Sequence, residues 1–357
     1  IAGTNGGRQL PSGFKRNQLG NNDIKWETTT QTNLGLDFSL FNATLYGSFD
    51  WYYKKTRDIL VQMAGIAAMG EGSTQWINAG EMENRGVEFN AGYRKTTSGG
   101  FHYDITGNIS TYRNKITALP ATVAANGTFG GNGVKSVIGH PMGAQVGYVA
   151  DGIFKSQDEI DNHARQDGAA LGRMRWKDLN GDNVITEADQ DWIYDPTPDF
   201  SYGFNVYLEY KNFDFTMFWQ GVQGVDIISD LKKQTDIWAG LNIGFLNKGH
   251  RLLDAWSTEN PGSDIPALSL SDNNNEKRVS TYWVENGSYL KLRTIQLGYN
   301  LPASVAGRLA MQRLRFYVSA QNLLSIHSKN FTGVDPENPN YGYPIPLNIT
   351  FGINVTF

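Results

Sequence analysis

Apolar and polar side chains alternate with a period of two over long stretches of this chain. From Leu34 to Leu40 every second residue is apolar, and polar or small residues stand between them. This alternation predicts β-strands with one apolar and one polar face. In the segment near 288–300 the phase changes after Leu292, which predicts a β-bulge. Nine such segments lie near 31–41, 44–53, 87–94, 101–110, 200–209, 213–220, 288–300, 314–321 and 348–357.

Two all-β architectures fit these segments. A soluble β-sandwich usually has strands of about 5–6 residues with charged side chains on its wet face. The strands of a transmembrane barrel are longer, roughly 9–11 residues, and pair a lipid-facing apolar side with a wet interior. The polar faces here carry mainly Asn, Ser, Thr, Gly and Tyr, and several segments have the longer length. The pattern therefore favours a transmembrane antiparallel β-barrel.

The links between the segments alternate between short and long. Leu40–Ala43 and Tyr210–Asn212 are examples of the short links. Outer-membrane barrels have short periplasmic turns and long outer loops, whereas a sandwich gives no reason for this order. The predicted outer loops lie near residues 56–83, 117–199, 224–287 and 325–344.

The number of segments bears on whether the barrel is complete. A complete bacterial barrel has an even number of strands, but the pattern predicts nine. One additional strand would restore an even number, and Val146–Phe154 is the best candidate for it. Otherwise we expect residues 1–357 to be the C-terminal portion of a larger barrel whose plug domain and N-terminal strands lie elsewhere.

Composition and motifs exclude several function classes. The chain has 31 Lys+Arg against 35 Asp+Glu, whereas nucleic-acid binding needs a basic face, so we expect no nucleic-acid partner. There is no cysteine, which excludes disulfides and thiolate metal sites. No apolar run approaches the roughly 18 residues of a membrane-spanning helix. The zinc-protease, P-loop and hydrolase-elbow motifs are missing from the sequence, so we expect no catalytic residues and no enzymatic activity.

The stretch Asp178–Asp189 carries a chemically specific spacing. Oxygen-bearing side chains stand at its positions 1, 3, 5, 9 and 12, and the carbonyl at position 7 offers a further ligand. This spacing is similar to that of an EF-hand loop, in which hard oxygens surround Ca²⁺, and to the shorter dockerin loop. An Asx-rich turn that binds nothing would have the same composition, so a structural Ca²⁺ is a hypothesis and no cofactor is required. The candidate ligands are Asp178, Asn180, Asp182, Val184, Thr186 and Asp189.

Aromatic residues are the candidates for contact with a transported substrate. Tryptophans in outer loops can stack on sugar rings, but they can equally pack within their own loop. Tyrosines on the polar strand faces suit the wall of a transport path. The predicted loops contain Trp76, Trp176 and Trp283 as well, but the substrate-binding candidates are Trp192, Trp238, Trp256, Tyr207 and Tyr317.

Several motifs resemble those of the SusC/RagA branch of the TonB-dependent outer-membrane transporters. The run Asn78–Glu88 has the N-x-G-x-x-x-N-x-G-x-E pattern of a strand entry in that family. The C-terminal run Tyr343–Phe357 is the most specific match. Further similar runs are Asp178–Asp189, Pro198–Phe204, Tyr210–Asp214, Val284–Arg293, Leu297–Pro302, Ala320–Leu324 and Gly333–Glu337.

The resemblance implies a multi-pass protein of the bacterial outer membrane, in contact with its lipid, and a complete barrel of 22 strands around an N-terminal plug. It also implies TonB-dependent import of nutrients too large for porins, chiefly oligosaccharides and in some members oligopeptides. The implied partners are a SusD-like surface lipoprotein that acts as a lid, and TonB, which would bind an N-terminal region outside this chain. A complete passive diffusion porin is the alternative that the pattern leaves open.

Overall fold

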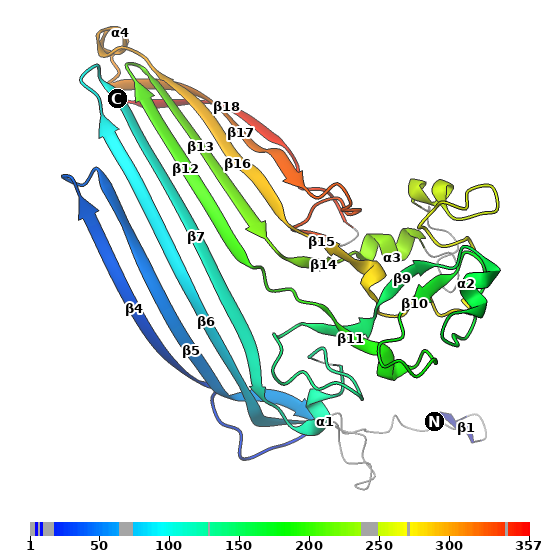
Figure 1. Cartoon of the computed structure of the whole chain (residues 1–357). Helices are drawn as coiled ribbons and strands as arrows, with labels where there is room; N and C mark the ends of the chain where they lie inside the picture. Colours follow the sequence, from blue (N-terminus) through cyan, green and yellow to red (C-terminus); the bar gives the residue numbers. More distant parts are fainter. Residues whose placement is uncertain are drawn as a thin grey trace.

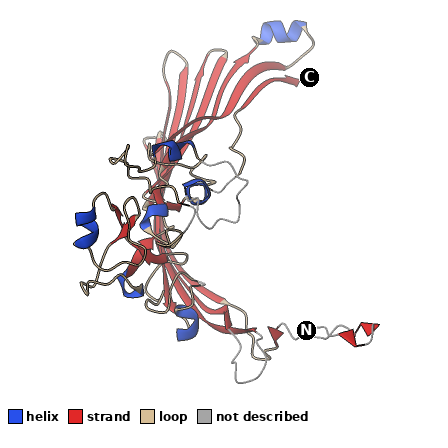
Figure 2. Ribbon diagram, turned by 90° about the vertical axis from the view of Figure 1, so that its right-hand side faces the viewer, coloured by secondary structure: helices blue, strands red, loops and turns tan. Residues whose placement is uncertain are grey.

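The computed structural model describes residues 4–5, 8–9, 18–63, 74–127, 129–236, 249–269, 272–339 and 342–357. Its main feature is one large sheet that curves into an open arc (Figures 1 and 2). Long strands that follow one another in the chain pair antiparallel. Across the sheet these are β4 (Thr28–Leu40), β5 (Leu45–Met63), β6 (Thr74–Thr96), β7 (Phe101–Ala118), β12 (Phe200–Tyr210), β13 (Phe213–Gln223), β16 (Tyr289–Asn300), β17 (Arg313–His327) and β18 (Asn348–Thr356).

All nine predicted strands belong to this sheet, so the predicted antiparallel all-β architecture is confirmed. The bulge predicted after Leu292 is also present, as a register shift between Leu292 and Thr294 in the β16–β17 ladder. The proposed additional strand, Val146–Phe154, does not join the sheet. It forms β8 (Gln145–Tyr148) and β9 (Ala150–Ile153), which pair in two small sheets with β11 (Gln190–Tyr194) and β10 (Met174–Trp176).

The prediction of a loop over residues 56–83 is wrong for most of its length. β5 continues to Met63 and β6 begins at Thr74. Their ladder has register shifts between Thr56 and Leu60. Each shift breaks the alternation while the pairing continues, so the period-two pattern is lost inside the strand. Trp76, predicted in a loop, is therefore a residue of β6.

The register carries the apolar face from strand to strand. Leu36 lies opposite Phe49, Phe49 opposite Phe89, and Phe89 opposite Ile109. Directly paired residues point to the same side of a sheet, so these side chains form one continuous surface. All four are exposed. Large apolar side chains exposed in a continuous band are typical of a surface that lipid covers.

The two ends of the sheet differ. At one end tight turns join the strands, and the longest of these links contains α4 (Ala303–Arg308). At the other end the described residues of the links 119–199 and 224–287, which we call the loop body, pack together beside the sheet (Figure 1). No helix among the described residues is long and apolar enough to cross a membrane. The loop body also contains α1 (Ala121–Ala124), α2 (Gln157–Asp161), η2 (Glu187–Asp189), β14 (Asp226–Ile228), α3 (Asp230–Asp236), η3 (His250–Asp254), η4 (Thr281–Trp283) and β15 (Val284–Asn286). Before the long strands, β1 (Thr4–Asn5) pairs with β2 (Arg8–Gln9), and the short β3 (Gln18–Leu19) joins the sheet by pairing parallel with β6.

The loop body has a core of its own. Trp176 and Phe154 are 0% exposed, and Trp283 is 1% exposed. A buried carboxylate joins the two long links, because Glu276 accepts hydrogen bonds from the Arg173 guanidinium and from the Met174 amide, both at 3.0 Å. The links are therefore folded against each other as one unit rather than as separate loops.

Candidate functional site

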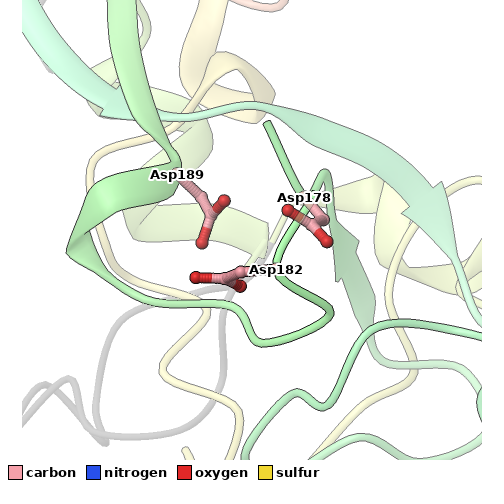
Figure 3. Close-up of side chains that lie close together, drawn as sticks. All are labelled: Asp178, Asp182 and Asp189. Atoms are coloured by element: carbon pink, nitrogen blue, oxygen red, sulfur yellow. The ribbon is translucent and has the colours of Figure 1, made fainter. Parts of the chain in front are cut away.

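The loop between β10 and β11 brings three carboxylates together (Figure 3). Oxygen atoms of Asp178, Asp182 and Asp189 all lie within 4.8 Å of one another. Asp189 is fully buried, whereas Asp182 is exposed. Carboxylates at such separations repel each other, and convergent hard oxygens are what a Ca²⁺ site requires. The donor set therefore fits a hard divalent cation.

Backbone amides hold this loop in shape. The amides of Asn183 and Gly181 donate to the two carboxylate oxygens of Asp178, at 2.9 and 2.7 Å. Desolvation acts to raise the pKa of Asp178, but these amide hydrogen bonds outweigh it and lower the pKa below its usual value. Asp178 is therefore ionised at neutral pH, as a cation ligand must be.

The other predicted ligands make turn-forming hydrogen bonds. Asn180 accepts a hydrogen bond from the Asp182 amide at 2.9 Å. The Thr186 hydroxyl accepts one from the Ala188 amide and caps η2. The Val184 amide donates to the Asp182 carboxylate at 2.9 Å. The structure thus brings the three acidic candidates together, and the roles of Asn180, Val184 and Thr186 as ligands stay predictions.

Two of the candidate tryptophans, Trp192 and Trp256, pack within the loop body. Trp192 stacks on His140 with the ring centres 3.7 Å apart. Trp256 packs against the cluster of Ile153, Met174 and Trp176. Trp238 lies outside the described residues. The side chains of Trp192 and Trp256 are both partly buried, and their role in substrate binding stays a prediction.

We call the polar face of the sheet, opposite the apolar face, the inner wall. Tyrosines on this inner wall lie flat across glycines of the neighbouring strand. Tyr46 lies opposite Gly92, and Tyr317 opposite Gly352. A Cβ on either glycine would lie 2.3 or 2.2 Å from the tyrosine ring, so only glycine leaves room for the ring there. The Tyr46 hydroxyl extends across the glycine to donate to Asp104 on the next strand at 2.8 Å. Another pair, Tyr52 with Gly86, is built in the same way.

An ionic network lines the inner wall near the short turns. The Arg315 guanidinium donates to both carboxylate oxygens of Asp214, with one bond of 2.9 Å, and Asn300 donates to the same carboxylate at 3.0 Å. The predicted candidate Tyr207 donates to Glu209 at 2.8 Å. These groups surround a polar cavity of about 260 Å³. Sequence reasoning missed the network because its members come from strands that are distant in the chain, although charges on predicted inward positions were a signal.

The outer end of the inner wall contains an apolar cavity of about 360 Å³ between the strand ends and the first residues of the loop body. Two acidic side chains, Glu27 and Glu81, stand among its lining residues. The apolar part of the lining consists of Ile59, Val61, Met82, Ile116, Leu119, Phe129 and Met142. Such a lining fits an aliphatic or aromatic group better than a sugar ring, because it offers few partners for hydroxyl groups.

A cluster of charges fixes the link between β17 and β18 to the wall. Lys291, which is 3% exposed, donates to Asp335 and to Glu337, each at 2.7 Å. Arg293 and Tyr289 also donate to Glu337. We call these five residues the clasp. Because both cations and both carboxylates are paired, the buried charges are compensated.

Together these features define the class of protein. The sheet is curved and antiparallel, has an apolar outer face and a polar inner face, and carries long loops at one end. This combination is that of an outer-membrane transport barrel. The chain belongs to the family described as TonB dependent receptor-like, beta-barrel, whose family model matches residues 2–323. The predicted outer-membrane location is thereby confirmed. The prediction that the chain is not an enzyme agrees with membership of a transporter family.

Individual relatives support the same assignment. The chain is 34% identical to the TonB-dependent receptor P3 of Formosa agariphila, over 98% of this chain and 36% of that protein. It is 27% identical to the TonB-dependent receptor SusC of Bacteroides thetaiotaomicron, over 94% of this chain and 32% of that protein. The solved structure of the RagAB peptide transporter matches with a TM-score of 0.75 and 26% identity, over 95% of this chain and 36% of that chain. The resemblance to the SusC/RagA branch is confirmed, and the chain spans about a third of the length of these relatives.

Proposed function

We propose that this chain forms the C-terminal part of a 22-stranded barrel that imports nutrients too large for porins in a TonB-dependent manner. The two free edges of the sheet support the larger barrel. Among the described residues, β4 pairs only with β5, and β18 only with β17. An unpaired backbone group in hydrocarbon costs several kcal/mol, so further strands must cover both edges. This requirement speaks against a complete porin made of these strands alone.

The proposed partners follow from the relatives. A SusD-like surface lipoprotein would cover the outer mouth as a lid, and TonB would act through a plug region N-terminal to the described sheet. The loop body supports the first of these proposals, because its buried core provides a rigid rim on which a lid can close. Deleting the gene for the lipoprotein or for TonB should abolish import while leaving folded barrel in the outer membrane.

We propose an oligosaccharide as the first candidate cargo. The observation that carries this proposal is the set of tyrosines laid across glycines on the inner wall. The Arg94 guanidinium lies 4.8 Å from the centre of the Tyr46 ring, so polar groups stand beside the aromatic surface. A flat aromatic face suits the apolar face of a sugar ring, and neighbouring Asn, Ser and Thr residues offer replaceable hydrogen bonds.

The test is growth of a deletion strain on defined oligosaccharides, complemented with the full-length protein. Tyr46→Leu combined with Tyr52→Leu should slow growth at limiting oligosaccharide concentration. Tyr202→Leu is the matched control, because Tyr202 lies across Gly221 in the same way but on the lipid-facing side. Growth of the uncomplemented deletion strain at the wild-type rate would refute oligosaccharide import.

An oligopeptide is the second candidate, favoured by the apolar cavity at the outer mouth and by the likeness to a peptide transporter. An apolar peptide side chain fits such a lining. Uptake of a leucine-containing peptide should be reduced by Met142→Gln and not by Val134→Gln, since Val134 is equally exposed at 54% but does not line the cavity. Equal uptake in both variants would argue against a role of the cavity in import.

We further propose that the loop Asp178–Asp189 holds a structural Ca²⁺. Asp178→Ala with Asp182→Ala in the full-length protein should abolish calcium binding in calorimetric titration and speed proteolytic cleavage of the loop body. Glu187→Gln is the control, because this acidic residue lies in the same loop but outside the carboxylate cluster. Unchanged calcium binding in the double variant would contradict the proposal.

A further inference from the structure

The lipid-facing side of the sheet changes character abruptly near the outer loops. Trp51 and Val87 lie opposite each other in the last apolar row of this region. Two residues further, about 7 Å along the strands, Tyr53 lies opposite Arg85, and Arg85 lies directly opposite Arg113. Alternation places these side chains on the same face as Trp51 and Val87. Two arginines therefore stand side by side where the apolar band ends.

The charges of this arginine pair are poorly compensated. Like charges directly opposite each other on adjacent strands destabilise the pairing. Arg113 reaches one carboxylate, that of Asp199 at 2.9 Å, and both side chains of this ion pair are more than half exposed. Within the described part of the chain, no hydrogen bond or ion pair involves the Arg85 side chain, which is exposed. In the next row outward, Lys55 and Lys115 lie opposite Glu83 on either side. Lys55 also forms an ion pair with Glu81 at 2.9 Å, so its charge is compensated.

A pocket of about 190 Å³ lies between the two arginines. Its lining includes Trp51, Val87 and Thr111 from the apolar side. Tryptophan is enriched where a membrane meets water, and the apolar band of the sheet continues directly from Trp51 and Val87. The pocket is thus placed at the depth of lipid headgroups, with positive charge toward the water and apolar surface toward the hydrocarbon.

We propose that Arg85 and Arg113 bind the phosphate group of a lipid in the outer leaflet of the outer membrane. A guanidinium presents paired N–H donors that match two phosphate oxygens, and one phosphate between the two side chains would relieve their mutual repulsion. The continuity with the apolar band favours a lipid over a free phosphate ion, because acyl chains would lie over Trp51 and Val87. This site is independent of the cargo and of the transport path, which lies on the opposite face of the sheet.

The experiment uses the full-length protein in detergent micelles doped with dioleoyl phosphatidic acid or dioleoyl phosphatidylcholine, with bound lipids counted by native mass spectrometry. We expect the wild-type protein to retain the phosphatidic acid at a concentration about tenfold lower than the phosphatidylcholine. Arg85→Gln should remove most of this preference without breaking any ion pair. Lys95→Gln is the matched control, since Lys95 lies on the same face of β6 at its other end, and it should leave the preference unchanged.

Three outcomes would overturn the proposal. These are an unchanged preference in Arg85→Gln, an equal loss in Lys95→Gln, or displacement of the lipid by inorganic phosphate at the same concentration, which would indicate a site for free anions. If Arg85→Gln lowers the yield of folded, heat-modifiable barrel, the variant Arg85→Lys is measured in its place. This variant keeps the charge but loses the paired donors, so its preference for phosphatidic acid should be weaker than that of the wild type. Arg113→Gln is measured as a second single variant and should also lose most of the preference. A full wild-type preference in both Arg85→Lys and Arg113→Gln would contradict the assignment.

Discussion

The sheet and the loop body place the same residue types in opposite positions. In the loop body, Trp176 and Phe154 are fully buried. On the sheet, Phe351 and Ile353 are 81% and 61% exposed, and polar residues line the inner wall instead. Water drives the first arrangement through the hydrophobic effect, whereas lipid permits the second.

Periodicity, and not overall hydrophobicity, therefore distinguishes the two regions. The mean hydropathy of the whole chain is −0.41, a value that gives no sign of a membrane protein. Strict alternation identifies the sheet because lipid and lumen lie on its two sides. The loop body follows no fixed period, since its core is assembled from many short segments.

The separation between the sheet and the loop body is tested most strongly by a substitution in the core of the loop body. Trp176→Ala should cost about 3–5 kcal/mol, because it leaves a cavity where a fully buried indole stood. Hydrogen exchange of the loop body should increase greatly while that of the sheet stays unchanged. Trp26→Ala is the control, because Trp26 is 93% exposed. Equal loss of protection in the sheet would show that the two regions are not separate in stability.

The second test places a charge on the lipid-facing side. Phe89→Arg should destabilise the barrel by about 2–4 kcal/mol, as measured by urea titration of the full-length protein in lipid vesicles. Asn90→Arg is the matched control, because it carries the same charge on the adjacent residue, which faces the inner wall. If both variants are equally destabilised, the assignment of the two faces is wrong.

These contrasts also explain which features the sequence could predict. The strands and the bulge in β16 depend on local alternation, and the cluster of Asp178, Asp182 and Asp189 depends on spacing within one loop. In β5, by contrast, register shifts erase the pattern, and the prediction failed there. The bond between Arg173 and Glu276 joins residues 103 positions apart. Contacts of this kind depend on the fold and leave no periodic signal.

The third test concerns the clasp, which joins a loop to the sheet. Burial acts to raise the pKa of Glu337, but hydrogen bonds from Arg293, Lys291 and Tyr289 lower it to about 2. A carboxylate with a lowered pKa stabilises the folded state fully above its unfolded pKa of about 4.3, and this contribution is lost as the pH falls toward 2. Pepsin cleavage near Asp335 should therefore accelerate between about pH 4 and pH 2.

Glu337→Gln provides the control for this pH dependence. Its cleavage near Asp335 should already be fast at pH 4 and should change less on further acidification, because the variant lacks the titrating carboxylate. Acceleration of the same size in both proteins would assign the effect to another group.

The smallest effect is expected from an ion pair on the surface of the loop body. Lys155 lies 3.0 Å from Asp264, whose side chain is 87% exposed. Exposed pairs contribute about 0–1 kcal/mol, so Lys155→Ala should change the stability of the loop body by no more than about 1 kcal/mol. A larger change in a chemical denaturation curve would mean that the lysine stem contributes through packing.

The tyrosines that lie across glycines on the inner wall have a consequence for the bore of the barrel. A tyrosine that projected inward would narrow the opening by the length of its side chain, whereas a ring laid on Gly92 or Gly352 narrows it only by its thickness. The same wall can thus carry large aromatic residues and still leave a wide passage. Each of these glycines therefore enlarges the space in front of the inner wall, although it has no side chain of its own.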